Sequence, residues 1–159
     1  MKSRSKDIAF LRTAIKLAAK GRQDVAPNPM VGALLVYGEK IIGRGYHTAF
    51  GKPHAEIEAI NDAVKKGNER LISLSTLYIS LEPCCHKGKT PPCTVAILKY
   101  RIPSVVYAMK DPNPKVNGDG AAKLKPAVIE TTLMTLREAR ELNKVFIKNV
   151  TAALPYIHL

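Results

Sequence analysis

Short apolar runs alternate with amphipathic stretches along this 159-residue chain, and this alternation constrains the fold more than any other feature. Strand-type runs cover residues 31–37, 41–46, 77–81, 104–108 and about 127–131. Helical spacing of apolar side chains covers residues 7–20, 55–64, a segment that starts near 90, and about 135–146. Strands that alternate with helices indicate an α/β domain with a partly parallel sheet. A tight turn at 38–40 joins the first two strands as a hairpin, so we expect a mixed five-stranded sheet.

The chain shows no internal repeat, linker or low-complexity segment. Its length favours one compact domain, which we expect to span residues 1–150, with 151–159 outside it. No apolar run approaches the length of a membrane span. The basic first residues lead into an amphipathic stretch rather than the apolar core of a signal peptide, so we expect a cytoplasmic protein with no membrane partner.

The chain is strongly basic, with 25 Lys and Arg against 13 Asp and Glu and a formal charge of +12. This balance fits a polyanionic partner such as RNA, a phosphorylated substrate, or simply a solvated basic surface. The basic residues are scattered rather than gathered in a tract, and the few aromatic residues are not interleaved with them as in a base-stacking surface. We therefore do not expect a nucleic-acid partner.

All three cysteines lie within ten residues, at positions 84, 85 and 93. An odd number in a chain without secretory signals argues against a disulfide framework and favours metal binding or catalysis. Pro53-His54-Ala55-Glu56 precedes Pro83-Cys84 and Cys93. One histidine and two thiolates supply three ligands for Zn²⁺ and leave the fourth tetrahedral position for water, as a catalytic zinc site requires. We predict that His54, Cys84 and Cys93 bind Zn²⁺.

Glu56 stands two residues after the predicted histidine ligand. A carboxylate there can take a proton from the attacking water and deliver it to a ring nitrogen and to the departing amine. This His-x-Glu followed by Pro-Cys pattern is typical of zinc nucleobase deaminases. A structural zinc site remains the alternative, because Cys85 or His86 can supply a fourth protein ligand.

Both predicted helix starts bear on this site. We expect His54 and Cys93 in the first turns of their helices, where the positive helix end favours a thiolate. For the helix of Cys93, Thr90 is the expected N-cap and Pro91 the expected first residue.

Longer segments resemble a known family. They are residues 27–32, 45–47, 53–56, 81–93, 111–120 and 142–146. In these segments the sequence resembles the deaminase domain of the bifunctional riboflavin-biosynthesis deaminase/reductase, a branch of the cytidine deaminase-like superfamily. The resemblance runs from about Asp7 to the end of the chain. Eight residues separate Cys84 from Cys93, whereas cytidine and transfer-RNA deaminases usually have two at this point. The family commonly has serine where this chain has Cys85.

The resemblance implies a three-layer α/β/α fold around the mixed five-stranded sheet. It implies hydrolytic deamination of a diaminopyrimidinone ribosylamine 5′-phosphate in riboflavin biosynthesis, with release of ammonia. It also implies a substrate pocket formed by Asn28, His47, Lys89, Asp111 and Asn113. Their chemistry fits, since amides and carboxylates bind ring edges and hydroxyls while His47 and Lys89 can approach a phosphate. The alternative is structural: both asparagines precede prolines and can shape turns.

A reductase domain follows the deaminase domain in the bifunctional enzymes. Residues 154–159 resemble the opening of its first strand. We therefore expect either an excised domain or a single-function deaminase that works with a separate reductase. We find no nicotinamide-binding region in the sequence and expect no reductase activity from this chain. The family also implies self-association as a homo-oligomer.

Overall fold

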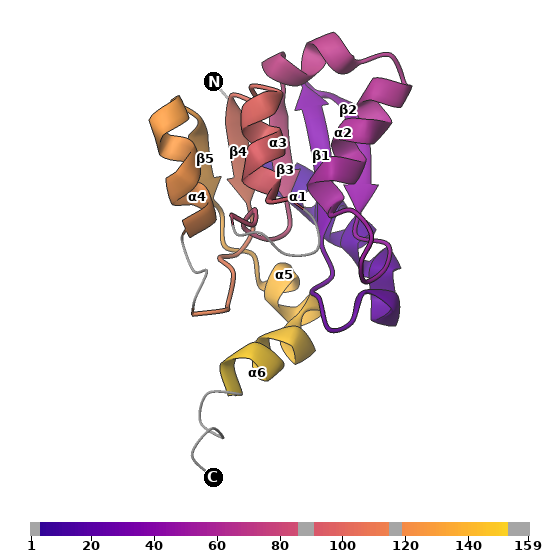
Figure 1. The fold of residues 1–159 in the computed structure, drawn as a ribbon, viewed down its shortest axis with the longest axis vertical. Helices are drawn as coiled ribbons and strands as arrows, with labels where there is room; N and C mark the ends of the chain where they lie inside the picture. The colour runs from indigo at the N-terminus through magenta and orange to yellow at the C-terminus, as the bar shows by residue number, and fades with distance from the viewer. Residues whose placement is uncertain (1–3, 86–90, 115–118, 153–159) are drawn as a thin grey trace.

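Five strands form one mixed sheet in the computed structural model, which describes residues 4–85, 91–114 and 119–152 (Figure 1). The strands are β1 (Gly32–Tyr37), β2 (Lys40–Tyr46), β3 (Thr76–Ile79), β4 (Ser104–Tyr107) and β5 (Glu130–Leu133). Their order across the sheet is β2-β1-β3-β4-β5. β1 is antiparallel to both of its neighbours, whereas β3, β4 and β5 run parallel. The predicted α/β fold with a mixed five-stranded sheet is confirmed.

Helices cover both faces of this sheet (Figure 1). The α-helices are α1 (Arg4–Ala18), α2 (Ala55–Lys65), α3 (Cys93–Lys99), α4 (Asp119–Leu124), α5 (Arg137–Leu142) and α6 (Lys144–Ala152). Three short 3₁₀ segments are η1 (Ala19–Val25), η2 (Glu69–Leu74) and η3 (Lys125–Ala127). Helices α2, α3 and α4 pack on one face, and α1 and α5 pack on the other. In the described residues, no helix combines the length and apolar character needed to cross a bilayer.

The two faces of β1 belong to two separate apolar clusters, which explains the layering. Ala33 and Leu35 pack with the apolar side chains of α2, η2 and α3. Leu34 and Val36 pack with α1 and α5 on the opposite face. Because successive side chains of a strand point to opposite faces, a strand covered on both sides must be apolar throughout. The continuous run Ala33–Val36 meets this requirement.

Helix α2 lies directly on β2, and glycine makes this contact possible. A Cβ atom at Gly45 would lie 2.3 Å from the backbone nitrogen of Ala59 and 2.4 Å from the carbonyl oxygen of Ala55. No side chain fits at that separation, so glycine lets the helix backbone approach the strand. The contact fixes the depth of α2, whose first turn carries Glu56.

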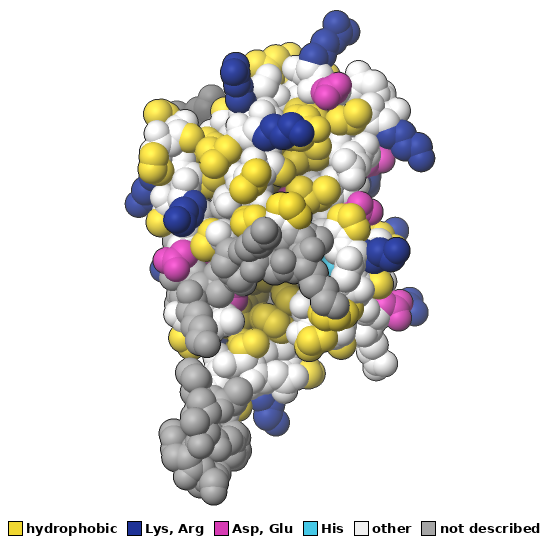
Figure 2. Space-filling view, viewed as in Figure 1, with side chains coloured by type: hydrophobic (Ala, Val, Ile, Leu, Met, Phe, Trp, Pro, Cys, Tyr) yellow, Lys and Arg dark blue, Asp and Glu magenta, His cyan; other side chains and the backbone are white. Residues whose placement is uncertain are grey.

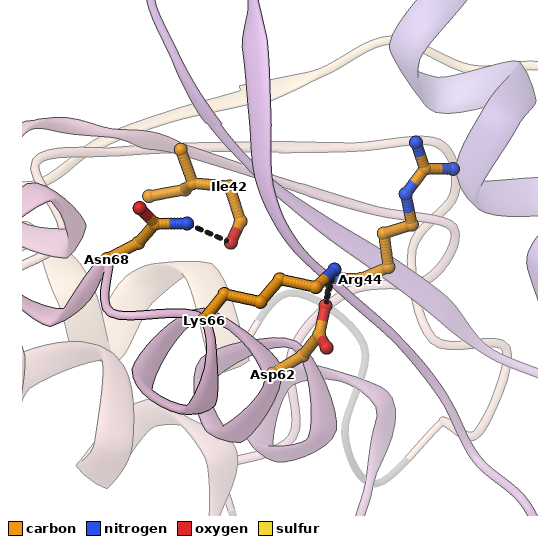
Figure 3. A network of polar contacts seen from close by, with 5 residues as sticks. All are labelled: Ile42, Arg44, Asp62, Lys66 and Asn68. Atoms are coloured by element: carbon orange, nitrogen blue, oxygen red, sulfur yellow. Dashed lines mark hydrogen bonds and ion pairs between the residues drawn. The ribbon is translucent and has the colours of Figure 1, made fainter.

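Polar contacts fix the other end of α2 (Figure 3). The Asp62 carboxylate accepts hydrogen bonds from the backbone N–H of Arg44 and from Lys66 Nζ, both at 2.8 Å. Burial raises the pKa of Asp62, but these two hydrogen bonds together with the positive charges of Lys66 and Arg44 lower it by more, so its pKa lies below the usual value. Asn68 Nδ2 donates to the carbonyl oxygen of Ile42 at 3.1 Å. The helix is thus attached to β2 along its whole length.

Helix α3 begins later than predicted. Its first residue is Cys93 and its N-cap is Pro92, with φ −58° and ψ 141° and no side-chain cap hydrogen bond. A residue that precedes proline is pushed out of the helical region, so Pro91 cannot begin a helix when Pro92 follows it. The predicted start at Pro91 was therefore wrong, and Thr90 lies outside the described residues.

Other element boundaries also differ from prediction. The first helix spans Arg4–Ala18 rather than residues 7–20, and η1 continues the chain. The fifth strand starts at Glu130 rather than near 127, because η3 and a left-handed Val128 (φ 59°) precede it. The helix predicted over 135–146 is two helices that meet at Asn143, whose side chain bonds a distant loop.

Candidate metal centre and substrate cavity

The site residues converge at one edge of the sheet. The segments after the parallel strands β3 and β4 carry Cys84 and Asp111, and β1 begins at the same edge because Ala33 pairs with Ile79. The segment before β1 carries Asn28, and the one after β2 carries His47. In open α/β sheets, ligands bind beyond the carboxyl ends of the parallel strands.

The three predicted metal ligands lie together, each held by a different element. His54 is the N-cap of α2, Cys93 is the first residue of α3, and Cys84 lies in the segment between β3 and α3. His54 Nδ1 lies 3.5 Å from Cys84 Sγ and 3.3 Å from Cys93 Sγ. All three donor atoms lie within 4.8 Å of one another.

This donor set fits zinc. Zn–S and Zn–N bond lengths in tetrahedral geometry imply sulfur–nitrogen separations of about 3.6 Å, close to those observed here. In the described residues, the group of possible metal ligands contains these three side chains and no fourth. Three protein donors leave one tetrahedral position open for water or substrate, as in a catalytic site.

The two thiols are electrostatically distinct. A hydrogen bond from Cys93 lowers the pKa of Cys84 to about 4 against the effect of burial, with His54 contributing further. The same hydrogen bond, together with burial, raises the pKa of Cys93. The bond with Cys84 also raises the pKa of His54, which burial opposes. The Cys93 backbone N–H donates to Cys84 Sγ at 3.2 Å and so favours a thiolate there. A divalent cation binding here would displace the remaining protons.

Glu56 is 3% exposed, in the first turn of α2. Burial and then the charge of Cys84 raise the pKa of Glu56 to about 7. A carboxyl group with a pKa near neutrality can both accept and release a proton at physiological pH. Its place beside the three donors gives the site an acid–base group in addition to a metal centre.

A cavity lies next to these groups, and it collects most of the predicted substrate residues. Asn28, His47, Asp111 and Asn113 line it together with His54, Glu56 and Cys84. Lys89 lies outside the described residues. The cavity wall also contains residues that the sequence analysis did not assign to the site: Pro29, Val31, Leu81, Glu82, Phe146 and Val150. All of these except Val150 lie in the segments that resemble the family, and that placement is the signal that could have identified them.

His47 is buried, and both of its ring nitrogens have protein partners. Nδ1 lies 3.0 Å from the carbonyl oxygen of Pro53, so Nδ1 carries the proton and donates it. Nε2 then accepts from Asn28 Nδ2 at 3.1 Å. Burial lowers the pKa of His47, which favours this neutral form. The His47 ring is thus hydrogen-bonded on both sides, to the Pro53 carbonyl and to the Asn28 amide.

Cys85 is not part of the three-donor group. It is half-buried, and burial, together with the nearby charge of Asp119, raises the pKa of its thiol. A raised pKa disfavours the thiolate that a zinc ligand requires. His86, the other alternative fourth ligand, lies outside the described residues.

A sheet of this order with this donor set falls in the class of zinc-binding deaminases. Residues 4–109 match the family described as the cytidine and deoxycytidylate deaminase zinc-binding region. The chain belongs to this family.

Two relatives of this chain carry names that specify a biosynthetic role. The Riboflavin biosynthesis protein RibD of Buchnera aphidicola subsp. Baizongia pistaciae is 46% identical over 97% of this chain, which spans 40% of that protein. The diaminohydroxyphosphoribosylamino-pyrimidine deaminase of Buchnera aphidicola subsp. Schizaphis graminum is 42% identical over 94% of this chain and 99% of its own length.

A solved structure agrees with these relatives. The deaminase/reductase of Thermotoga maritima matches with a TM-score of 0.87 and 45% identity, over 94% of this chain and 42% of that one. This chain thus corresponds to the deaminase part of the longer proteins.

Proposed function

We propose that this chain hydrolyses the 2-amino group of a diaminopyrimidinone ribosylamine 5′-phosphate and releases ammonia, a step of riboflavin biosynthesis. The observation that carries the proposal is the buried Glu56 beside three zinc donors in a cavity lined by Asn28, Asp111 and Asn113. Two facts support the choice of substrate: a relative that this chain matches almost end to end is named for this reaction, and the eight-residue Cys84–Cys93 spacing differs from that of cytidine deaminases.

The proposed ligands are His54, Cys84 and Cys93, and Zn²⁺ bound to them would lower the pKa of a water molecule at the open position. Glu56 accepts the proton of the attacking water and protonates the ring nitrogen beside the reacting carbon. The hydroxyl group now on the carbon gives its proton to Glu56, and Glu56 transfers this second proton to the amino nitrogen as the carbon–nitrogen bond breaks. Oxygen replaces nitrogen on the ring, and ammonia leaves.

The cavity wall provides complementary contacts for such a ring. Asn28, Asp111 and Asn113 offer donors and acceptors for the ring edge and the ribose hydroxyls. Val31, Leu81 and Phe146 offer apolar surface for the ring faces. We propose that His47 orients Asn28 and that Lys89 binds the phosphate.

A comparison of three separate substrates tests this proposal. Zinc-loaded protein is offered, separately, the diaminopyrimidinone phosphate, deoxycytidine monophosphate and an RNA hairpin, and ammonia or base conversion is measured. The proposal expects turnover of the first alone. Turnover of the RNA hairpin without turnover of the diaminopyrimidinone phosphate would overturn it. Basic side chains lie singly over the molecular face of Figure 2, which supports a small-molecule substrate.

We also propose that the chain acts in the cytoplasm with a reductase, fused or separate, and that it self-associates. Support for self-association comes from α3, where Val95 is 53% and Leu98 39% exposed. Sedimentation at micromolar concentration should give a species larger than a monomer, and a monomer would contradict this part of the proposal.

A further inference from the structure

A buried carboxylate joins the segment that carries a metal ligand to the segment that carries the substrate residues. Glu82 is 3% exposed and lies two residues before Cys84. Its Oε1 accepts a hydrogen bond from the backbone N–H of Asp111 at 3.0 Å. Its Oε2 accepts from the N–H of Gly120 at 3.1 Å and of Ala121 at 3.4 Å. One side chain thus holds the backbone at two separate points after β4.

The first of these points belongs to the cavity wall. Asp111 and Asn113 both line the cavity, as does Glu82 itself. The Asp111 carboxylate accepts from the backbone N–H of Asn113 at 2.9 Å, so the two residues form one turn. Because Glu82 fixes the peptide nitrogen of Asp111, it also fixes the start of this turn.

The second point is a close backbone contact between the start of α4 and the Glu82–Pro83 segment. A Cβ atom at Gly120 would lie 1.9 Å from the carbonyl oxygen of Pro83 and 3.3 Å from Glu82 Cγ. Glycine at this position therefore lets the first turn of α4 approach the Glu82–Pro83 segment closely enough to donate its N–H groups.

We propose that Glu82 is a positioning residue for substrate binding: its carboxylate holds Asp111 and α4 so that Asp111 and Asn113 face the substrate. This inference rests on the proposed function and adds a residue to it. Glutamine has the same shape but only one acceptor oxygen, so its NH₂ group would face a backbone N–H at one of the two points. Glu82→Gln should therefore loosen the turn while leaving the zinc ligands in place.

Steady-state kinetics test the inference. For Glu82→Gln we expect KM to rise about tenfold and kcat to change by less than about threefold, because the lost interactions position substrate rather than move protons. Zinc content should equal that of the wild type. Gly120→Ala should shift KM in the same direction, and it carries the test if Glu82→Gln does not fold. Glu69→Gln, an exposed control on η2, should change neither constant. The inference would be overturned by a fall in kcat at constant KM or by a loss of zinc. It would also be overturned if neither Glu82→Gln nor Gly120→Ala changed the kinetic constants.

Amide hydrogen exchange separates this inference from the proposed function. In Glu82→Gln the N–H groups of Asp111 and Gly120 should exchange about tenfold faster than in the wild type, because each loses a buried acceptor or its fixed geometry. The amide of Val106 in β4 should not change. Unaltered exchange at Asp111 and Gly120 would overturn the inference. If wild-type protein releases no ammonia, the proposed function fails, and the exchange result alone decides the role of Glu82.

Discussion

The side-chain amide of Asn143 pairs with both backbone groups of Met30. Oδ1 accepts from the Met30 N–H and Nδ2 donates to the Met30 carbonyl oxygen, each at 2.8 Å. Asn143 is 3% exposed and separates α5 from α6. Since Asn28 lies two residues before Met30 and Phe146 lies in α6, this pair joins two walls of the cavity beside the three metal donors.

Removing this pair should destabilise the protein. In Asn143→Ala both Met30 groups lose their partner, and we expect the free energy of unfolding to fall by about 2–4 kcal/mol. Asn143→Asp retains the acceptor for the Met30 N–H and should lose less. Urea denaturation measures both, with the exposed Asn149→Ala as control. Equal stability of Asn143→Ala and the control would contradict a stabilising role of the Asn143–Met30 hydrogen bonds.

The contact of α2 with β2 should control zinc affinity. Gly45→Ala puts a methyl group within 2.4 Å of two α2 backbone atoms, so the helix that carries His54 must move. We expect a loss of about 1–3 kcal/mol in unfolding free energy and weaker zinc binding in a chelator competition. Gly38→Ala is the matched control: its φ of +62° makes it strained by about 1–2 kcal/mol, but its Cβ meets no atom and should not affect zinc. Equal zinc affinity in both variants would refute this role of Gly45.

The adjacent cysteines should differ in zinc binding. Cys84→Ser removes a donor 3.5 Å from His54 Nδ1, and we expect it to lose stoichiometric zinc. Cys85→Ser should keep one zinc per chain, because Cys85 is not among the three grouped donors. Metal analysis of the two purified variants measures this directly. The opposite pattern would identify Cys85 as the ligand.

The fold and the metal donors followed from local sequence signals. The short run 104–107, bounded by turn residues, indicated a buried strand, and the placement of His54, Cys84 and Cys93 near helix starts and a strand end indicated that they meet. The predicted start of a helix was wrong where two local sequence preferences compete. Pro91 is suited to a helix start, yet Pro92 after it forces an extended backbone.

The remaining site features depend on contacts between distant residues, which periodicity does not reveal. The helix predicted over 135–146 breaks at Asn143 because the side chain bonds Met30, 113 residues away. The sequence places Glu82 after a strand but does not show which groups its carboxylate contacts. The structure shows three backbone N–H groups that donate to it. The side chain of His47 suggests a phosphate ligand, whereas burial and the Pro53 carbonyl favour its neutral form.

Ammonia release by zinc-loaded wild-type and Glu56→Gln protein tests the proposed reaction and the role of Glu56 together. With the diaminopyrimidinone ribosylamine 5′-phosphate, the wild type should release ammonia, and removal of zinc should abolish the release. Glu56→Gln should bind zinc and keep its fold while losing about 10²–10⁴-fold in rate, because the amide cannot transfer the proton. Unchanged ammonia release by Glu56→Gln would contradict the role of Glu56. No release by folded, zinc-loaded wild type would contradict the proposed reaction.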